Sequence, residues 1–158
     1  MSRELPSHAH VVVIGAGVAG CSVAYHLTKM GWYDVVLLER QTLASGTSGF
    51  AAGLVTQLRA SRALTEISRY AVQLYAEMEK GPGQKPGFKQ TGNVSVARVP
   101  DRMAEYRRIV SLGHAFGVEL QEVSPAEIGE MLPLLHTDDL SGGYHVAMDG
   151  QTTPPTPP

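Results

Sequence analysis

Two short apolar runs near the start of the chain predict neighbouring strands of a parallel sheet. Residues 11–14 and 35–38 are uninterrupted runs of Val, Ile and Leu without polar alternation, which is typical of strands buried on both faces. Residues 18–30 between them carry apolar side chains at helical spacing, and Gly31 is placed to end that helix in a left-handed conformation. The order strand, helix, strand predicts a βαβ unit.

The next two segments predict a loop and an amphipathic helix. Residues 43–54 are too rich in glycine for a helix over their first half, so they are expected to form a loop with exposed backbone N–H groups. Residues 61–79 place apolar side chains three and four positions apart, which predicts one stripe along a helix whose opposite face is solvated. The stripe consists of Leu64, Ile67, Ala71, Leu74 and Met78.

From about Gly92 onward the pattern predicts a small β-rich excursion. Three short segments have strand patterns, and two of them alternate, which favours an antiparallel sheet with one covered face. These segments are residues 93–99, 118–123 and 143–148. Residues 101–116 are helical in pattern, and Ser124 and Glu127 have the spacing of a capping box. The fold class is α/β, with a Rossmann-like βαβ start.

Length and charge limit the classes of function. The chain has 158 residues, with 13 Lys and Arg against 15 Asp and Glu, and this balance predicts no nucleic-acid binding. No apolar run approaches the roughly 20 residues that cross a bilayer. A single cysteine cannot form an internal disulfide, and the start of the chain reads as neither a signal nor a transit peptide. The expected location is the cytoplasm, or the mitochondrial matrix in a eukaryote.

The length also predicts a single domain. A chain of this size has enough residues for one core, and the domain is expected over residues 8–151. Residues 152–158 are rich in Pro and Thr, which supports neither a helix nor a paired strand. We expect these last residues to be a disordered tail.

A glycine motif follows directly on the first predicted strand. Residues 15–20 read Gly-Ala-Gly-Val-Ala-Gly, and this motif between a strand and a helix indicates dinucleotide binding. The first glycine allows a tight turn, the second lets a pyrophosphate approach the backbone, and the third lets the helix pack closely on the strands. Free amides at the helix start favour phosphate. The candidate cofactor-binding residues here are Gly15, Ala16, Gly17, Val18, Ala19 and Gly20.

An acidic residue ends the second predicted strand. Glu39 stands where a carboxylate accepts hydrogen bonds from both hydroxyls of an adenosine ribose, and Arg40 follows it. The negative charge of Glu39 would repel a 2′-phosphate, which disfavours NADP. The βαβ unit by itself leaves NAD and FAD as open alternatives.

The segment after the βαβ unit resembles a known family. Residues 43–55, Leu-Ala-Ser-Gly-Thr-Ser-Gly-Phe-Ala-Ala-Gly-Leu-Val, resemble the flavin-contacting loop of the D-amino-acid-oxidase-like FAD oxidoreductases. Further blocks are similar to the start of the sarcosine and dimethylglycine dehydrogenase branch. They are residues 25–32, 57–61, 90–92, 125–127 and 149–151. The resemblance implies an incomplete FAD-binding domain.

The resemblance also implies how FAD is held. Glu39 would contact the adenosine ribose, and Thr47 and Ser48 the pyrophosphate. Small residues after them would let the isoalloxazine ring lie against backbone. The residues that the resemblance adds to the candidate site are Thr47, Ser48, Phe50, Ala51, Ala52, Gly53 and Leu54.

The implied reaction is the oxidation of a small N-methyl amine such as sarcosine or dimethylglycine. In that family, hydride leaves the methyl carbon for flavin N5, and the iminium product is hydrolysed or passes its one-carbon unit to tetrahydrofolate. The substrate-side groups, and any tetrahydrofolate site, are expected beyond Thr152. We therefore assign no catalytic residue here and expect a truncated N-terminal portion that is not active alone.

Phe50 departs from the family pattern. It stands where many members carry a histidine linked covalently to the flavin, and phenylalanine has no nitrogen to form that bond. The expected cofactor is therefore non-covalently bound FAD. The same substitution occurs in the regulatory subunit of pyruvate dehydrogenase phosphatase, so the alternative is a non-catalytic, flavoprotein-like regulatory module.

The remaining polar candidates favour ordinary surface roles. The 6 histidines show no i, i+4 pair and no cysteine partner, so no metal site is expected. His8 and His10 flank the first strand and are expected to be solvated. Three arginines are expected on the solvent-exposed face of a helix, and the alternative is that they contact a substrate carboxylate. They are Arg59, Arg62 and Arg69.

Overall fold

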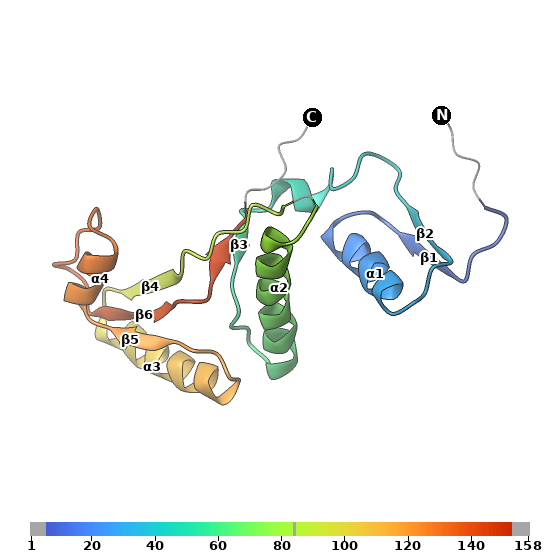
Figure 1. Ribbon diagram of the computed structural model, residues 1–158. Coiled ribbons are helices and arrows are strands. Elements are labelled where there is room, and N and C mark those ends of the chain that lie inside the picture. The colour runs from blue at the N-terminus through green and yellow to red at the C-terminus, as the bar shows by residue number, and fades with distance from the viewer. Residues whose placement is uncertain (1–5, 84, 153–158) are drawn as a thin grey trace. The chain divides into compact units, whose positions relative to one another are not determined.

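The computed structural model describes residues 6–83 and 85–152 of the chain (Figure 1). The chain divides into two compact units, the first up to Ala52 and the second from Gly53. A single domain over residues 8–151 stays a prediction. Of the predicted tail, all residues after Thr152 lie outside the described residues. Within the described part of the chain, no helix is long and apolar enough to cross a membrane.

The first unit is the predicted βαβ unit followed by a loop. Strand β1 runs parallel to β2, in register from Val11 opposite Val35 to Ile14 opposite Leu38, and α1 connects them (Figure 1). Gly31 has a φ of 91° after the helix, as the sequence predicted. The elements are β1 (Val11–Ile14), α1 (Val18–Lys29), β2 (Val35–Leu38) and the 3₁₀ helix η1 (Thr47–Phe50).

The two strands are less buried than their apolar runs predicted. Val12 is 52% exposed and Ile14 is 85% exposed, whereas Val13 points toward α1, with its Cγ1 3.4 Å from where a Cβ on Gly20 would lie. Side chains alternate between the two faces of a strand. Because α1 covers one face and no described element of this unit covers the other, β1 is not buried on both faces as expected, whereas the residues of β2 are all half-buried.

The second unit contains the β-rich excursion. Strand β6 pairs antiparallel with β4 on one side and with β5 on the other, and α3 lies against this sheet (Figure 1). Strands β3 and β7 form a separate antiparallel pair. The elements are β3 (Leu54–Val55), α2 (Arg62–Lys80), β4 (Asn93–Ala97), α3 (Pro100–Ala115), β5 (Gln121–Val123), α4 (Pro125–Met131), β6 (Gly142–Val146) and β7 (Gly150–Gln151).

Apolar side chains from α3, the segment between α3 and β5, and β6 form the core of the second unit. Val110, Val118, Leu120 and Val146 pack together and are buried. The predicted capping box is present at α4, because the Ser124 side chain accepts from the Glu127 backbone N–H while the Glu127 side chain accepts from that of Ser124. The antiparallel sheet predicted from Gly92 onward is confirmed.

Helix α2 buries a different face from the one predicted. Thr65 and Val72 are its buried residues, whereas Leu64, Ile67 and Met78 of the predicted stripe are 53%, 65% and 40% exposed. The Thr65 hydroxyl favours burial of its own face of α2, since it accepts a hydrogen bond from the backbone N–H of Arg59 at 3.0 Å. Within the second unit, Leu64, Ile67 and Met78 therefore face outward, whereas Ala71 and Leu74 of the same stripe are half-buried.

A buried carboxylate connects distant segments of the second unit. Asp149 is 3% exposed, and its Oδ1 accepts from the backbone N–H of Gln57 at 2.9 Å. Burial raises the pKa of Asp149, against the opposing effect of the hydrogen bonds from Gln57. The backbone N–H of Thr152 also donates to the carbonyl of Gly53 at 2.7 Å. Both contacts hold the end of the described chain to the start of this unit.

Candidate nucleotide-binding site

Two of the motif glycines, Gly15 and Gly20, have backbone surroundings that another residue would disturb. Gly15 has a φ of 98°, a conformation that favours glycine, and its N–H donates to the Leu38 carbonyl at 2.8 Å. A Cβ on Gly20 would lie 1.8 Å from the Gly15 carbonyl oxygen. Gly20 thus lets α1 pack directly against the turn that leaves β1.

The start of α1 faces the hydroxyl of Ser48, which lies in the loop after β2. Gly17 is the N-cap residue and no acidic side chain lies in the first turn. The backbone N–H of Val18 donates to Ser48 Oγ at 2.9 Å. The first N–H groups of a helix have no intrahelical acceptor and carry partial positive charge. A hydroxyl that accepts here can still donate its own hydrogen, so Ser48 and the helix start can together bind an anion.

Glu39 lies beside the glycine turn. Its Oε2 accepts from the Ala16 backbone N–H at 2.8 Å, and its Oε1 accepts from that of Gln41 at 2.9 Å. The hydrogen bond from Ala16, and next that from Gln41, hold the pKa of Glu39 below its usual value. The carboxylate therefore stays ionised and can accept further hydrogen bonds, each oxygen having more than one lone pair.

The loop after β2 folds back onto the glycine turn. The backbone N–H of Ala44, which has a φ of 60°, donates to the Ala16 carbonyl at 3.1 Å. A Cβ on Gly49 would lie 2.8 Å from the Ala44 carbonyl oxygen, so the loop also packs closely on itself. Between loop and turn lies a pocket of about 490 Å³. It is lined by Ile14, Gly15, Gly17, Leu38, Glu39, Arg40, Gln41, Ala44, Ser45 and Gly46.

Many of the predicted site residues meet at this pocket. Gly15, Gly17, Glu39 and Arg40 line it, and a hydrogen bond connects Ala16 to Glu39. Val18 and Ser48 are hydrogen-bonded to each other, and Ser48 Oγ lies 3.3 Å from where a Cβ on Gly17 would lie. Gly20 contacts the same turn. Ala19 lies in the first turn of α1, and Thr47 begins η1. The cofactor contacts of all these residues stay predictions.

Other predicted residues lie away from the pocket lining. Phe50 is 84% exposed, and Ala51 and Ala52 follow it as exposed residues. Gly53 and Leu54 belong to the second unit, where Leu54 pairs with Gln151. Their approach to a flavin stays a prediction.

The sequence-based site omitted part of the pocket wall. Ala44, Ser45 and Gly46 line the pocket but were not selected, although they belong to the small-residue segment that begins at residue 43. Their small side chains were the available signal, since small residues permit close approach of a ligand to backbone.

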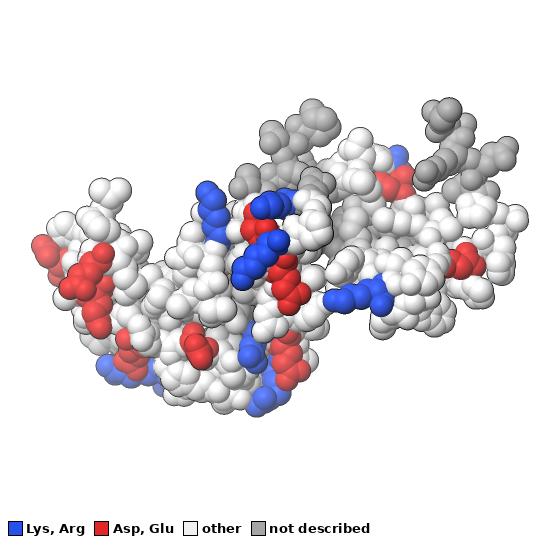
Figure 2. Space-filling model, viewed as in Figure 1, with Lys and Arg blue, Asp and Glu red and all other residues white. Residues whose placement is uncertain are grey.

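Outside the pocket, positively and negatively charged side chains are interspersed on the surface. On the face drawn in Figure 2, Lys and Arg lie among Asp and Glu, and the described residues there form no broad basic patch. Arg62 donates to the Ala115 carbonyl at 2.6 Å and Arg59 to Thr56 Oγ1 at 2.6 Å. These arginines thus make local contacts within the second unit.

Comparison with known proteins agrees with this geometry. The family model described as FAD dependent oxidoreductase matches residues 10–156. The chain is 44% identical over 154 residues to human mitochondrial sarcosine dehydrogenase, covering 97% of this chain and 17% of that protein. It is 40% identical over 148 residues to the mitochondrial pyruvate dehydrogenase phosphatase regulatory subunit of Mus musculus, covering 94% of this chain and 17% of that one.

A solved structure shows the same fold. The L-proline dehydrogenase of P. horikoshii superposes with a TM-score of 0.87 at 26% identity, covering 95% of this chain and 39% of that chain. The resemblance noted in the sequence is therefore confirmed, and with a family match over nearly its whole length this chain belongs to the FAD-dependent oxidoreductase family.

Proposed function

We propose that the first unit binds the ADP part of FAD. The observation that carries this proposal is the convergence of the Glu39 carboxylate, the glycine turn and the loop after β2 on one pocket. Glu39 would accept hydrogen bonds from the ribose hydroxyls. The start of α1 and the Ser48 hydroxyl would hold the pyrophosphate, as their hydrogen-bonding geometry supports.

The residues present fit this group. The N–H groups of Gly15 and Ala16 already donate to Leu38 and Glu39, so donors for phosphate would come from the first turn of α1 and the Ser48 hydroxyl. Gly15 and Gly17 add no side chain to the pocket that they line. The ionised Glu39 favours a free ribose over a phosphorylated one, because a 2′-phosphate would place like charges together. The site thus favours FAD over NADP.

We propose that the whole protein to which these residues correspond oxidises a small N-methyl amine such as sarcosine or dimethylglycine. The chain spans 17% of the length of human sarcosine dehydrogenase, so this activity is assigned to the longer protein. Bound FAD supplies the acceptor for hydride from the substrate methyl carbon. The residues of this chain bind and orient the adenine half of the cofactor. Tetrahydrofolate coupling, if present, belongs to the longer protein as well.

We propose that FAD is held without a covalent bond. Phe50 is exposed and carries no nucleophilic atom. Acid precipitation of the FAD-loaded chain tests this directly, because a covalently bound flavin stays with the protein. Yellow flavin in the supernatant is the expected result, and yellow flavin in the pellet contradicts the proposal.

The second candidate function is a non-catalytic regulatory module. It is favoured by the 40% identity to the regulatory subunit of pyruvate dehydrogenase phosphatase. Anaerobic addition of sarcosine to the FAD-loaded longer protein distinguishes the two. Loss of flavin absorbance supports the amine dehydrogenase, whereas unchanged absorbance with FAD still bound supports the module. From the 158 residues alone we expect no reduction.

Location follows the same relatives. Both mammalian relatives described above are named as mitochondrial, so for a eukaryotic source we propose the matrix, and otherwise the cytoplasm. Cell fractionation with detection of the longer protein tests this assignment.

A further inference from the structure

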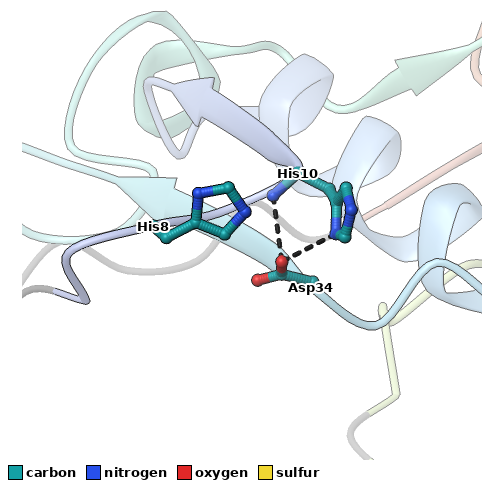
Figure 3. Close-up of side chains that lie close together, drawn as sticks. All are labelled: His8, His10 and Asp34. Carbon is teal, nitrogen blue, oxygen red and sulfur yellow. Dashed lines mark hydrogen bonds and ion pairs between the residues drawn. The ribbon is translucent and has the colours of Figure 1, made fainter.

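Three potential metal ligands meet at the start of the two parallel strands. His8, His10 and Asp34 each offer one ligand atom, and these atoms lie within 4.8 Å of one another (Figure 3). His10 Nδ1 lies 2.8 Å from Asp34 Oδ2, and the same oxygen accepts from the His10 backbone N–H at 3.1 Å. Among the described residues, this is the one such cluster of three.

The sheet register explains why these side chains meet. Val11 pairs with Val35, so the preceding residues, His10 and Asp34, are neighbours where the two strands begin. His8 lies beside His10 in the segment that precedes β1, with ring centroids 5.7 Å apart.

The donor set determines the class of ion. Two imidazoles and a carboxylate bind late first-row divalent ions such as Zn²⁺. Bonds of about 2.0–2.1 Å place neighbouring ligand atoms of a tetrahedral site roughly 3.3 Å apart. The cluster spans somewhat more than this, and exposed side chains can close the difference by rotation.

We propose that His8, His10 and Asp34 form a binding site for Zn²⁺ or a similar divalent transition-metal ion, with water completing its coordination. The ion would join the start of β1 to the start of β2. This lies at the opposite end of the strands from the nucleotide pocket, which lies after Ile14 and Leu38. The site is therefore independent of the proposed FAD binding. The sequence predicted no metal site because it has no i, i+4 histidine pair and no cysteine partner, whereas the third ligand, Asp34, comes from the distant segment that precedes β2.

A second histidine and carboxylate pair provides a matched control. His136 Nε2 lies 3.4 Å from Asp138 Oδ2, and both side chains are exposed. This pair does not belong to a cluster of three ligands among the described residues. Removing His136 should therefore leave metal affinity unchanged.

The test is a calorimetric titration of the 158-residue chain, without a histidine tag, with ZnCl₂ in the absence of FAD. One equivalent of Zn²⁺ should bind. His8→Ala and Asp34→Asn should each weaken binding about tenfold or more, since each removes a ligand, while His136→Ala should bind as the unchanged chain does. His8→Ala leaves the pair of His10 and Asp34 in place, so its effect does not depend on losing that contact.

Three results would overturn the proposal. The first is no saturable Zn²⁺ binding by the folded unchanged chain. The second is equal binding by His8→Ala and the unchanged chain, and the third is an equal loss in His136→Ala. Circular dichroism of each variant verifies that the compared chains are folded.

Discussion

Glu39 Oε2 lies 2.8 Å from the backbone nitrogen of Ala16, so the acid that ends β2 reaches the glycine turn that ends β1. The parallel register explains this contact, because Ile14 and Leu38 are paired and the residues after them leave the sheet at the same edge. One carboxylate is thereby placed beside the amides that bind phosphate in sites of this type. The contact connects the two sequence signals for nucleotide binding.

Replacing Glu39 should weaken FAD binding specifically. Glu39→Gln keeps the shape of the side chain but removes its charge, and hydrogen bonds in which one partner is ionised are stronger than those between neutral groups. The affinity for FAD, measured by flavin fluorescence, should fall about tenfold or more. Glu105→Gln removes an exposed partner of Arg102 in the second unit and should have no effect. Equal affinities for Glu39→Gln and the unchanged chain would remove Glu39 from the site.

The pH dependence of binding should follow the same carboxylate. Hydrogen bonds from Ala16 and Gln41 hold the pKa of Glu39 below its usual value, so in the folded chain the carboxylate becomes protonated only as the pH falls through a value below the usual glutamate pKa of about 4.3. FAD affinity should therefore be constant from about pH 7 to 5 and decrease only below that usual value. In Glu39→Gln this decrease should be absent; an identical decrease in both chains would assign it to another group.

Gly20→Ala should disrupt the first unit. Its new Cβ would lie 1.8 Å from the Gly15 carbonyl oxygen, so α1 must move away from the turn, at a cost of about 3 kcal/mol. We expect a lower melting temperature and loss of FAD binding. Gly129→Ala is the matched control in α4, where the nearest atoms are 3.7 Å away on the Thr137 side chain. That variant should be neutral, or more stable by up to about 1 kcal/mol.

Asp149→Ala should destabilise the second unit. It leaves the buried backbone N–H of Gln57 without its acceptor, which costs about 1–3 kcal/mol. Asp149→Asn retains a side-chain oxygen that can accept this hydrogen bond, so it should lower the stability of the chain less than Asp149→Ala does. Asp138→Ala changes a side chain that is 88% exposed and should unfold at the same urea concentration as the unchanged chain. If Asp149→Ala unfolds at the same urea concentration as the unchanged chain, the contact with Gln57 contributes little to stability.

Local patterns predicted the first unit well because its geometry is set within a short stretch of chain. Residues 11–14 and 35–38 form β1 and β2, and the glycines that permit the turn and the close helix are the residues that the motif marks. The pocket wall at Ala44 was missed, because its place depends on a backbone contact with Ala16. A hydrogen bond between two backbone groups does not depend on the side chains, so the sequence gives no signal for it.

Burial was predicted less well because it depends on what surrounds an element. The apolar residues Ile14, Leu64 and Ile67 are more than half exposed, although their patterns indicated covered faces. On α2, the buried residues are Thr65 and Val72, which do not belong to the predicted stripe. Periodicity reports which side chains share a face, but the partner of that face is a property of the tertiary structure.

Binding of the ADP part of FAD by the first unit is tested most simply by calorimetric titration of the folded 158-residue chain with FAD, ADP and FMN. If the first unit binds the adenine half of the cofactor, FAD should bind with saturation at one site, ADP should compete with it, and FMN, which lacks the adenosine, should bind far more weakly. Binding of FMN as tight as that of FAD, or no FAD binding by a chain that circular dichroism shows to be folded, would contradict the account.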